Sequence, residues 1–329
     1  MLPLPIFQHH APRTLEEVVT LLGTLGAEAR LIAGGTDLLP NMKHGLVEPE
    51  HLISLARVDE LRGIVMADDH LVVGAMTTLD VIAGDAHVRE HAPAFAEACG
   101  LVGGPHHRRM GTLGGNVCLD TRCVYYNQTY FWRQSLGFCL KKDGTQCHVV
   151  SSGRNCVAAA SNDSASTLMV LGGVIELRGP KGARSVAADD FYTPDGIHNT
   201  VKAPDEVVTG IRIPMRKDRT SAYEKLRRRA SIDYPALSVA VRLDRDADGG
   251  IDDADVVISA LAARPKRIKA AARHLRNTAA DALTESISAA AEAAYKGSKP
   301  LTNIDQDPEW RREMARVLVR KALTRAAGG

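Results

Sequence analysis

The chain has 329 residues, a length that allows two or three domains of roughly 100–200 residues each. Its 41 Lys and Arg residues balance 39 Asp and Glu residues, and this net charge of +2, without a basic patch interleaved with aromatic residues, argues against nucleic-acid binding. No apolar run approaches the roughly 20 residues that cross a bilayer, and the first residues do not resemble a signal peptide. We interpret the six cysteines as reduced intracellular thiols and not as a disulfide framework. We therefore expect a cytoplasmic protein that binds neither nucleic acid nor a membrane.

The first hundred residues predict short helices and strands. Thr14 and Glu17 have the spacing of a capping box, and Gly26 is a typical helix stop, so a helix is expected between them. Short apolar strands are expected at residues 31–33, 52–55 and 71–75. One helix is expected over residues 88–100, where Gly100 ends the pattern.

The remainder of the chain predicts a change of architecture near residue 221. Before it, a helix is expected at residues 164–171 and strands at 173–177 and 206–213. After it, alternating strands meet at a hairpin signal, Asp248-Gly249-Gly250, and a further strand covers residues 254–260. Helices are then expected over residues 264–277, 280–294 and 308–326. Three strands followed by helices indicate a separate α+β domain.

Two glycine-rich loops are candidate anion sites. The first, Ala33-Gly34-Gly35-Thr36-Asp37, follows a predicted strand, and the second is Gly111-Thr112-Leu113-Gly114-Gly115-Asn116. Glycines let the backbone approach a ligand closely, and successive amides bind anions. A tight turn explains the first loop equally well when it is taken alone. Neither loop has the Rossmann spacing, but together they indicate one large anionic ligand held from two sides.

The segments Leu31-Ile32-Ala33-Gly34-Gly35-Thr36-Asp37 and Thr112-Leu113-Gly114-Gly115-Asn116 resemble the two flavin loops of the FAD-binding medium subunit of molybdenum hydroxylases, such as xanthine dehydrogenase and carbon monoxide dehydrogenase. This resemblance covers nearly the whole chain. It implies an α+β fold in which FAD-binding subdomains at residues 1–56 and 57–215 precede a C-terminal flavoprotein domain at residues 216–329.

The same resemblance implies further FAD-binding residues. Asp163 matches the acidic position near the FAD ribose, Lys225 matches the lysine near the flavin, and Val208 also falls in the FAD site. Two plainer interpretations stay open. Asp163 is also a good helix N-cap residue, and a lysine on a strand is most often solvated.

Four cysteines are concentrated in one short stretch of the chain. Cys123, Cys139, Cys147 and Cys156 are separated by fifteen, seven and eight residues, which indicates a bound metal or cluster. The spacing alone gives zinc and an iron–sulfur cluster equal weight. Five other cysteines and histidines are less suitable ligands, namely Cys118, His106, His107, His148 and Cys99, which is expected to be a buried small hydrophobe.

These cysteines lie in an insertion, residues 119–158, that ordinary flavin subunits of the family lack. The insertion resembles that of the β subunit of 4-hydroxybenzoyl-CoA reductase, which carries a [4Fe–4S] cluster. The resemblance implies that Cys123, Cys139, Cys147 and Cys156 are the four cluster ligands. We expect Tyr125, Tyr126 and Trp132 to pack the insertion and shield the cluster.

The leading hypothesis is an electron-transfer subunit without catalytic residues of its own. The resemblance implies a large molybdopterin subunit, a small subunit with two [2Fe–2S] clusters, a dimer of heterotrimers, and an external ferredoxin-like carrier. One alternative is the flavin subunit of a hydroxylase that uses NAD or another acceptor and has a zinc-stabilised insertion. The other is a non-catalytic zinc-bound assembly module whose glycine loops are only turns.

Overall fold

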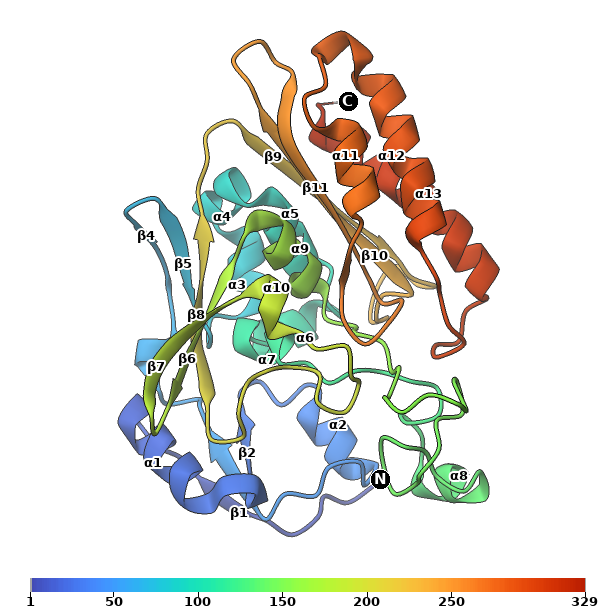
Figure 1. The fold of residues 1–329 in the computed structure, drawn as a ribbon. Helices are drawn as coiled ribbons and strands as arrows, with labels where there is room; N and C mark the ends of the chain where they lie inside the picture. Colours follow the sequence, from blue (N-terminus) through green and yellow to red (C-terminus); the bar gives the residue numbers. More distant parts are fainter. Residues whose placement is uncertain (1, 329) are drawn as a thin grey trace.

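Three β-sheets follow one another along the chain in the computed structural model, which describes residues 2–328 (Figure 1). The first sheet has the order β1-β3-β2 and is parallel, the second has the order β4-β5-β8-β6-β7, and the third has the order β12-β11-β10-β9. The last two are antiparallel. Within residues 2–328, no helix is long and apolar enough to cross a membrane.

The first sheet is built from β1 (Gln8–His10), β2 (Ala29–Ile32) and β3 (His51–Ser54). Helix α1 (Leu15–Leu25) begins where predicted, because the Thr14 hydroxyl accepts a hydrogen bond from the Glu17 amide at 3.2 Å. It ends at Gly26, whose φ of 54° suits glycine. Val18 and Leu22 of α1 are buried in one cluster with Ile53 of β3, which fixes the helix on the sheet.

The second sheet is surrounded by short helices. Its strands are β4 (Ile64–Ala67), β5 (His70–Gly74), β6 (Val174–Gly179), β7 (Gly182–Ala187) and β8 (Val207–Pro214). Its helices are α3 (Leu79–Gly84), α4 (Ala86–His91), α5 (Pro93–Gly100), α6 (Pro105–Met110), α7 (Leu113–Val117), α9 (Asp163–Leu171) and α10 (Ala188–Phe191).

The single helix predicted over residues 88–100 is wrong. The chain breaks between α4 and α5 at Ala92, whose backbone has φ −143° and ψ 56°. Proline lacks an amide hydrogen and disfavours the helical conformation in the residue before it, so Pro93 starts a new helix instead of continuing the old one. The periodicity of apolar residues runs through this break, which is why the pattern alone did not reveal it.

The third sheet contains β9 (Arg219–Leu226), β10 (Leu237–Arg245), β11 (Ile251–Ser259) and β12 (Lys266–Arg267). Helices α11 (Lys269–Leu275), α12 (Leu283–Gly297) and α13 (Pro308–Ala326) cover one face (Figure 1). The predicted hairpin between β10 and β11 is confirmed. The predicted helix start at residue 264 is wrong, because Lys266 and Arg267 pair with β11 and make a fourth strand.

Both faces of the third sheet are covered. On the face opposite to α11, α12 and α13, helix α5 contacts β9, and helix α9 contacts β10 and β11. Residues Tyr223, Ala240 and Val257 of the third sheet therefore belong to the same buried cluster as the helices of the second sheet. This shared core joins the C-terminal part of the chain rigidly to the part that carries the second glycine loop.

The insertion, residues 119–158, has little regular secondary structure and contains one short helix, α8 (Tyr130–Ser135). It lies near α2 (Leu38–Lys43), in the lower right of Figure 1. Its two ends meet. The amide of Arg122 donates to the carbonyl of Ala159 at 2.9 Å, and the amide of Ala159 donates back at 2.7 Å. The chain therefore leaves and re-enters the flanking fold at adjacent points.

Candidate functional site

The structure brings the two glycine loops together. The first loop, residues 33–37, follows β2, and the second loop, residues 111–116, begins after α6 and includes the first four residues of α7. Gly34 contacts the end of α6 so closely that a Cβ atom there would lie 1.9 Å from the carbonyl oxygen of Met110. Glycine at this position is therefore required for the contact between the loops.

The loops differ in the hydrogen bonds of their amides. Within residues 2–328, the amides of residues 34–37 donate no hydrogen bond, so this loop presents four successive free donors at the start of α2. In the second loop, the Leu113 and Gly114 amides donate to Thr77 (3.0 Å) and Ala75 (2.8 Å). The amides of residues 115–116 are also bonded, to Thr112, so within residues 2–328 the second loop keeps a free amide only at Thr112. FAD binding by the second loop stays a prediction.

The polar side chains of the second loop have positioning roles. The Thr112 hydroxyl caps α7 by accepting from the Gly115 amide at 3.3 Å. The Asn116 Oδ1 atom accepts from both the amide (3.2 Å) and the hydroxyl (2.6 Å) of Ser164, at the start of α9. Thr112 and Asn116 are both buried, so they tie the second loop to the core.

Asp163 and Lys225 form a buried ion pair, with Nζ 2.9 Å from Oδ1 and side chains only 3% and 1% exposed. The Tyr223 hydroxyl donates to Asp163 at 2.6 Å, and Lys225 donates to the Leu101 carbonyl at 3.0 Å. Burial raises the pKa of Asp163 and lowers the pKa of Lys225, and in both groups the charge of the other opposes the shift. Both plainer interpretations are wrong: Asn162 is the N-cap of α9, and Lys225 is not solvated.

Val208 lies on β8 with a buried side chain in the central core, so only its backbone is available to a ligand. Asp37 has contacts that the sequence did not suggest. Its carboxylate accepts from Arg122 at 2.8 Å and from the Tyr234 hydroxyl at 3.0 Å, and the Arg122 guanidinium lies 4.2 Å from the Tyr234 ring centroid. Burial raises the pKa of Asp37, although Arg122 opposes this shift.

This junction connects three parts of the chain: the first loop, the start of the insertion and the loop after β9. Arg122 directly precedes Cys123, so one ion pair links the first loop to the cysteine stretch. No motif marks Arg122 or Tyr234 in the sequence. The only available signal was that Arg122 is adjacent to a candidate ligand.

The four cysteines of the insertion are free thiols, and Cys123 lies near the other three. Burial raises the pKa of the Cys123 thiol to about 12, with smaller contributions from nearby Cys156, Cys139 and Cys147. Cys139, Cys147 and Cys156 are buried. Cys99, in contrast, lies in the core around α5, which confirms that it is a buried small hydrophobe.

The sulfur atoms are not as close as the ligands of a single zinc ion. Within residues 2–328, one group of three potential ligands has its ligand atoms all within 4.8 Å of one another, namely Glu28, Glu50 and His51, and it contains no cysteine. A tetrahedral zinc ion with Zn–S bonds of about 2.3 Å holds its sulfur ligands about 4 Å apart.

Backbone amides point at two of the sulfur atoms. The Val150 amide donates to Cys147 Sγ at 3.5 Å, and the Ala158 amide donates to Cys156 Sγ at 3.4 Å. Around them, the Tyr125 ring packs against Trp132 and His148, with centroid distances of 6.3 and 5.1 Å. Together with the buried Tyr126, these contacts confirm that the aromatic residues pack the insertion.

Comparison with known proteins agrees with this architecture. Residues 5–216 match the family described as FAD binding domain in molybdopterin dehydrogenase, and residues 221–326 match the CO dehydrogenase flavoprotein C-terminal domain. The chain is 31% identical over 327 residues to the carbon monoxide dehydrogenase medium chain of Hydrogenophaga pseudoflava, covering 99% of this chain and 98% of that protein. For the medium chain of Afipia carboxidovorans, the identity is 33% over 323 residues, with coverages of 97% and 96%.

Solved structures give the same result. The chain is similar to a structure of carbon monoxide dehydrogenase from Hydrogenophaga pseudoflava with a TM-score of 0.80 and 30% identity, covering 100% of this chain and 99% of that chain. The chain therefore belongs to the FAD-binding medium subunits of the molybdenum hydroxylases, and it is the flavin subunit of an oxidoreductase of this family.

Proposed function

We propose that this subunit carries electrons between an external one-electron carrier, a [4Fe–4S] cluster held by Cys123, Cys139, Cys147 and Cys156, an FAD, and partner subunits. The observation that carries the proposal is the insertion itself: it holds four free thiols, Cys123 lies near the other three, and the ion pair between Arg122 and Asp37 joins it to the first loop. An iron–sulfur cluster transfers one electron at a time, and FAD transfers one or two, so their combination lets one-electron and two-electron partners exchange electrons.

The first loop provides the argument for where FAD binds. Four successive free amides at residues 34–37 suit a pyrophosphate, which needs closely spaced donors that no other group uses. The second loop supports the first one, since Gly34 packs on Met110 and Asn116 fixes α9. The buried pair of Asp163 and Lys225 would act on the bound FAD as a fixed charge arrangement, rather than by making bonds in the reaction.

The donor set fits a [4Fe–4S] cluster. Four thiolates are the usual ligand count of such a cluster, and amides that donate to the sulfur atoms are one way in which proteins tune its potential. Four irons occupy the space between the thiolates, so a cluster holds them farther apart than one zinc ion does. Among residues 2–328, no three of these sulfur atoms lie within 4.8 Å of one another, and the amides of Val150 and Ala158 donate to two of them, which is compatible with such a cluster.

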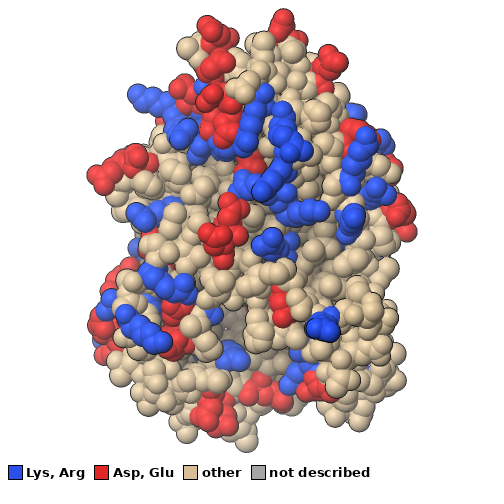
Figure 2. Space-filling model, viewed as in Figure 1, with Lys and Arg blue, Asp and Glu red and all other residues tan. Residues whose placement is uncertain are grey.

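Substrate chemistry would occur on a partner subunit. The relatives are called medium chains, which supports a complex with a large molybdopterin subunit and a small [2Fe–2S] subunit, in a dimer of heterotrimers. Helix α8 exposes Tyr130 and Phe131, and the lower right of Figure 2, where the insertion lies, is poor in charged residues. Exposed aromatic residues with few charges are typical of the centre of a protein interface.

We infer that the complex most closely resembles 4-hydroxybenzoyl-CoA reductase, in which ferredoxin electrons drive a reductive dehydroxylation to benzoyl-CoA. The insertion with its four cysteines supports this assignment. A second candidate is an oxidising hydroxylase that passes electrons to NAD or another acceptor, and it is supported by relatives named carbon monoxide dehydrogenase and xanthine dehydrogenase.

One experiment separates these candidates: metal analysis and a visible spectrum of anaerobically purified protein. About four irons per subunit with one FAD supports the proposal. Zinc with a flavin that NADH bleaches supports the hydroxylase. Zinc without a flavin spectrum would identify the chain as an assembly module, and either zinc result would end the cluster assignment.

The Gly35→Val variant should lose most of its FAD. Gly35 has a φ of +69°, and a Cβ atom there would lie 3.1 Å from Leu39, so valine must distort the free amides of the first loop. The measurement is the flavin absorbance per folded subunit after gel filtration. Gly249→Val is the control, because it makes the same substitution at another glycine with a positive φ (+82°), in the hairpin between β10 and β11. Full FAD content in Gly35→Val would contradict binding at this loop.

A further inference from the structure

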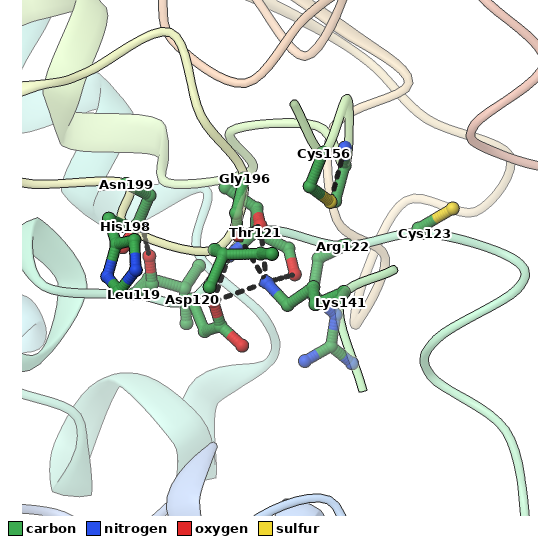
Figure 3. Close-up of polar contacts among 12 residues, drawn as sticks. Leu119, Asp120, Thr121, Arg122, Cys123, Lys141, Cys156, Gly196, His198 and Asn199 are labelled. Carbon is green, nitrogen blue, oxygen red and sulfur yellow. Dashed lines mark hydrogen bonds and ion pairs between the residues drawn. The ribbon is translucent and has the colours of Figure 1, made fainter. Parts of the chain in front are cut away.

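Lys141, a residue of the insertion between Cys139 and Cys147, has a buried ammonium group with several partners. Its Nζ atom lies 2.6 Å from Asp120 Oδ1, 2.6 Å from Thr121 Oγ1 and 2.7 Å from the Gly196 carbonyl oxygen (Figure 3). The side chain is only 5% exposed, and Nζ lies 4.6 Å from the centroid of the Tyr126 ring. This degree of burial is rare for lysine unless the charge is paired.

The partners of Lys141 belong to the two ends of the site. Asp120 and Thr121 lead into the insertion just before Cys123, and the Gly196 amide donates to the carbonyl of Cys156 at 2.8 Å. Gly196 packs directly on Cys156, since a Cβ atom there would lie 2.8 Å from Sγ. One ammonium group therefore contacts both the segment that leads to Cys123 and the loop that supports Cys156.

Lys141 itself lies at the tip of a tight turn. The Lys142 amide donates to the Cys139 carbonyl at 2.9 Å, and the Leu140 amide donates to the Gln146 carbonyl at 2.9 Å. These bonds couple Lys141 to Cys139 on one side and to Cys147 on the other. Any displacement of the Lys141 side chain therefore moves the turn that carries two of the four thiols.

We propose that Lys141 is the positioning residue of the four-cysteine site. It fastens the turn that carries Cys139 and Cys147 to the segments that carry Cys123 and Cys156, and it places a fixed positive charge beside the bound cluster. This inference rests on the proposed function. A nearby cation stabilises the more negative, reduced state of a cluster, so Lys141 raises its reduction potential.

The test compares Lys141→Met with Lys142→Met in the anaerobically purified holoprotein. Lys142 is the matched control, because its ammonium pairs only with Asp143 at 3.4 Å and its side chain is 31% exposed. Iron release to a chelator should be at least about 10-fold faster in Lys141→Met, as for other residues that orient metal ligands. The cluster potential should fall, Lys141→Arg should restore it in part, and FAD should stay bound.

Two outcomes overturn this inference and are distinguishable. If the wild-type protein lacks iron, the cluster assignment fails and this inference fails with it. If the wild-type protein holds iron but Lys141→Met and Lys142→Met have equal release rates and potentials, only the role of Lys141 is refuted. Should Lys141→Met not fold, Thr121→Val removes the hydroxyl that accepts from Lys141 and donates to the Gly196 carbonyl. Iron release no faster than in Lys142→Met would then refute the role equally.

Discussion

The Cys147→Ser variant should lose most of its iron and retain its FAD. Cys147 is buried and its sulfur accepts a hydrogen bond from Val150, so the substitution removes one of the four proposed ligands from a buried position. Neither glycine loop contains a cluster ligand, and the first loop is joined to the insertion through Arg122 rather than through a cysteine. Iron and flavin content per subunit, with the reduced-state magnetic signal, measure both effects.

The functional consequence follows from the position of the insertion outside the flavin fold. The variant complex should fail with a ferredoxin donor, yet electrons should still pass between FAD and the molybdenum subunit after chemical reduction. Cys118→Ser is the matched control, since it makes the same substitution outside the insertion and should keep the cluster. Undiminished ferredoxin-linked activity in an iron-depleted Cys147→Ser complex would refute the cluster as the entry point.

The Lys225→Met variant should be destabilised by about 3–5 kcal/mol, because it leaves the Asp163 carboxylate buried without its cation. Thermal or denaturant unfolding measures this loss. Burial already raises the pKa of Asp163, and removing Lys225 raises it further, so the native variant binds a proton more tightly than the unfolded chain does. The stability of the variant is therefore greatest at low pH and falls as the pH rises through that raised pKa.

Two controls isolate the buried pair. Arg229→Met breaks the ion pair with Asp233, in which the arginine side chain is 68% exposed, and should change the stability little because solvent screens such a pair. The double variant Lys225→Met/Asp163→Leu removes both charges and should recover most of the stability. In the flavin-loaded protein, Lys225→Met should also lower the flavin potential. An unchanged potential would mean that the pair supports only the fold.

Structural features that depend only on neighbouring residues were predicted correctly from the sequence. The cap at Thr14, the stop at Gly26 and the hairpin between β10 and β11 each depend on neighbouring residues, and all three are confirmed. The short strand at residues 266–267 and the break between α4 and α5 at Ala92 were not predicted. The first depends on pairing with β11, and the second is hidden by continuous apolar periodicity.

The candidate site shows the same division. The glycine pairs and the four cysteines were visible as motifs, and the structure places each set together. Their supporting contacts were not visible, because Asp37 and Tyr234 are 197 residues apart, and Lys141 and Gly196 are 55 residues apart. Such contacts depend on the three-dimensional path of the chain. The free amides of the first loop and the bonded amides of the second also look alike in the sequence.

The paired ends of the insertion suggest how such a subunit could arise. Arg122 and Ala159 close the excursion with two hydrogen bonds, so the flanking chain keeps the same path whatever length of chain lies between them. A coding segment could enter a gene at this point without changing the register of any strand, and loop length itself costs little free energy. The fold on either side therefore accommodates the insertion without any change in its own strand pairing.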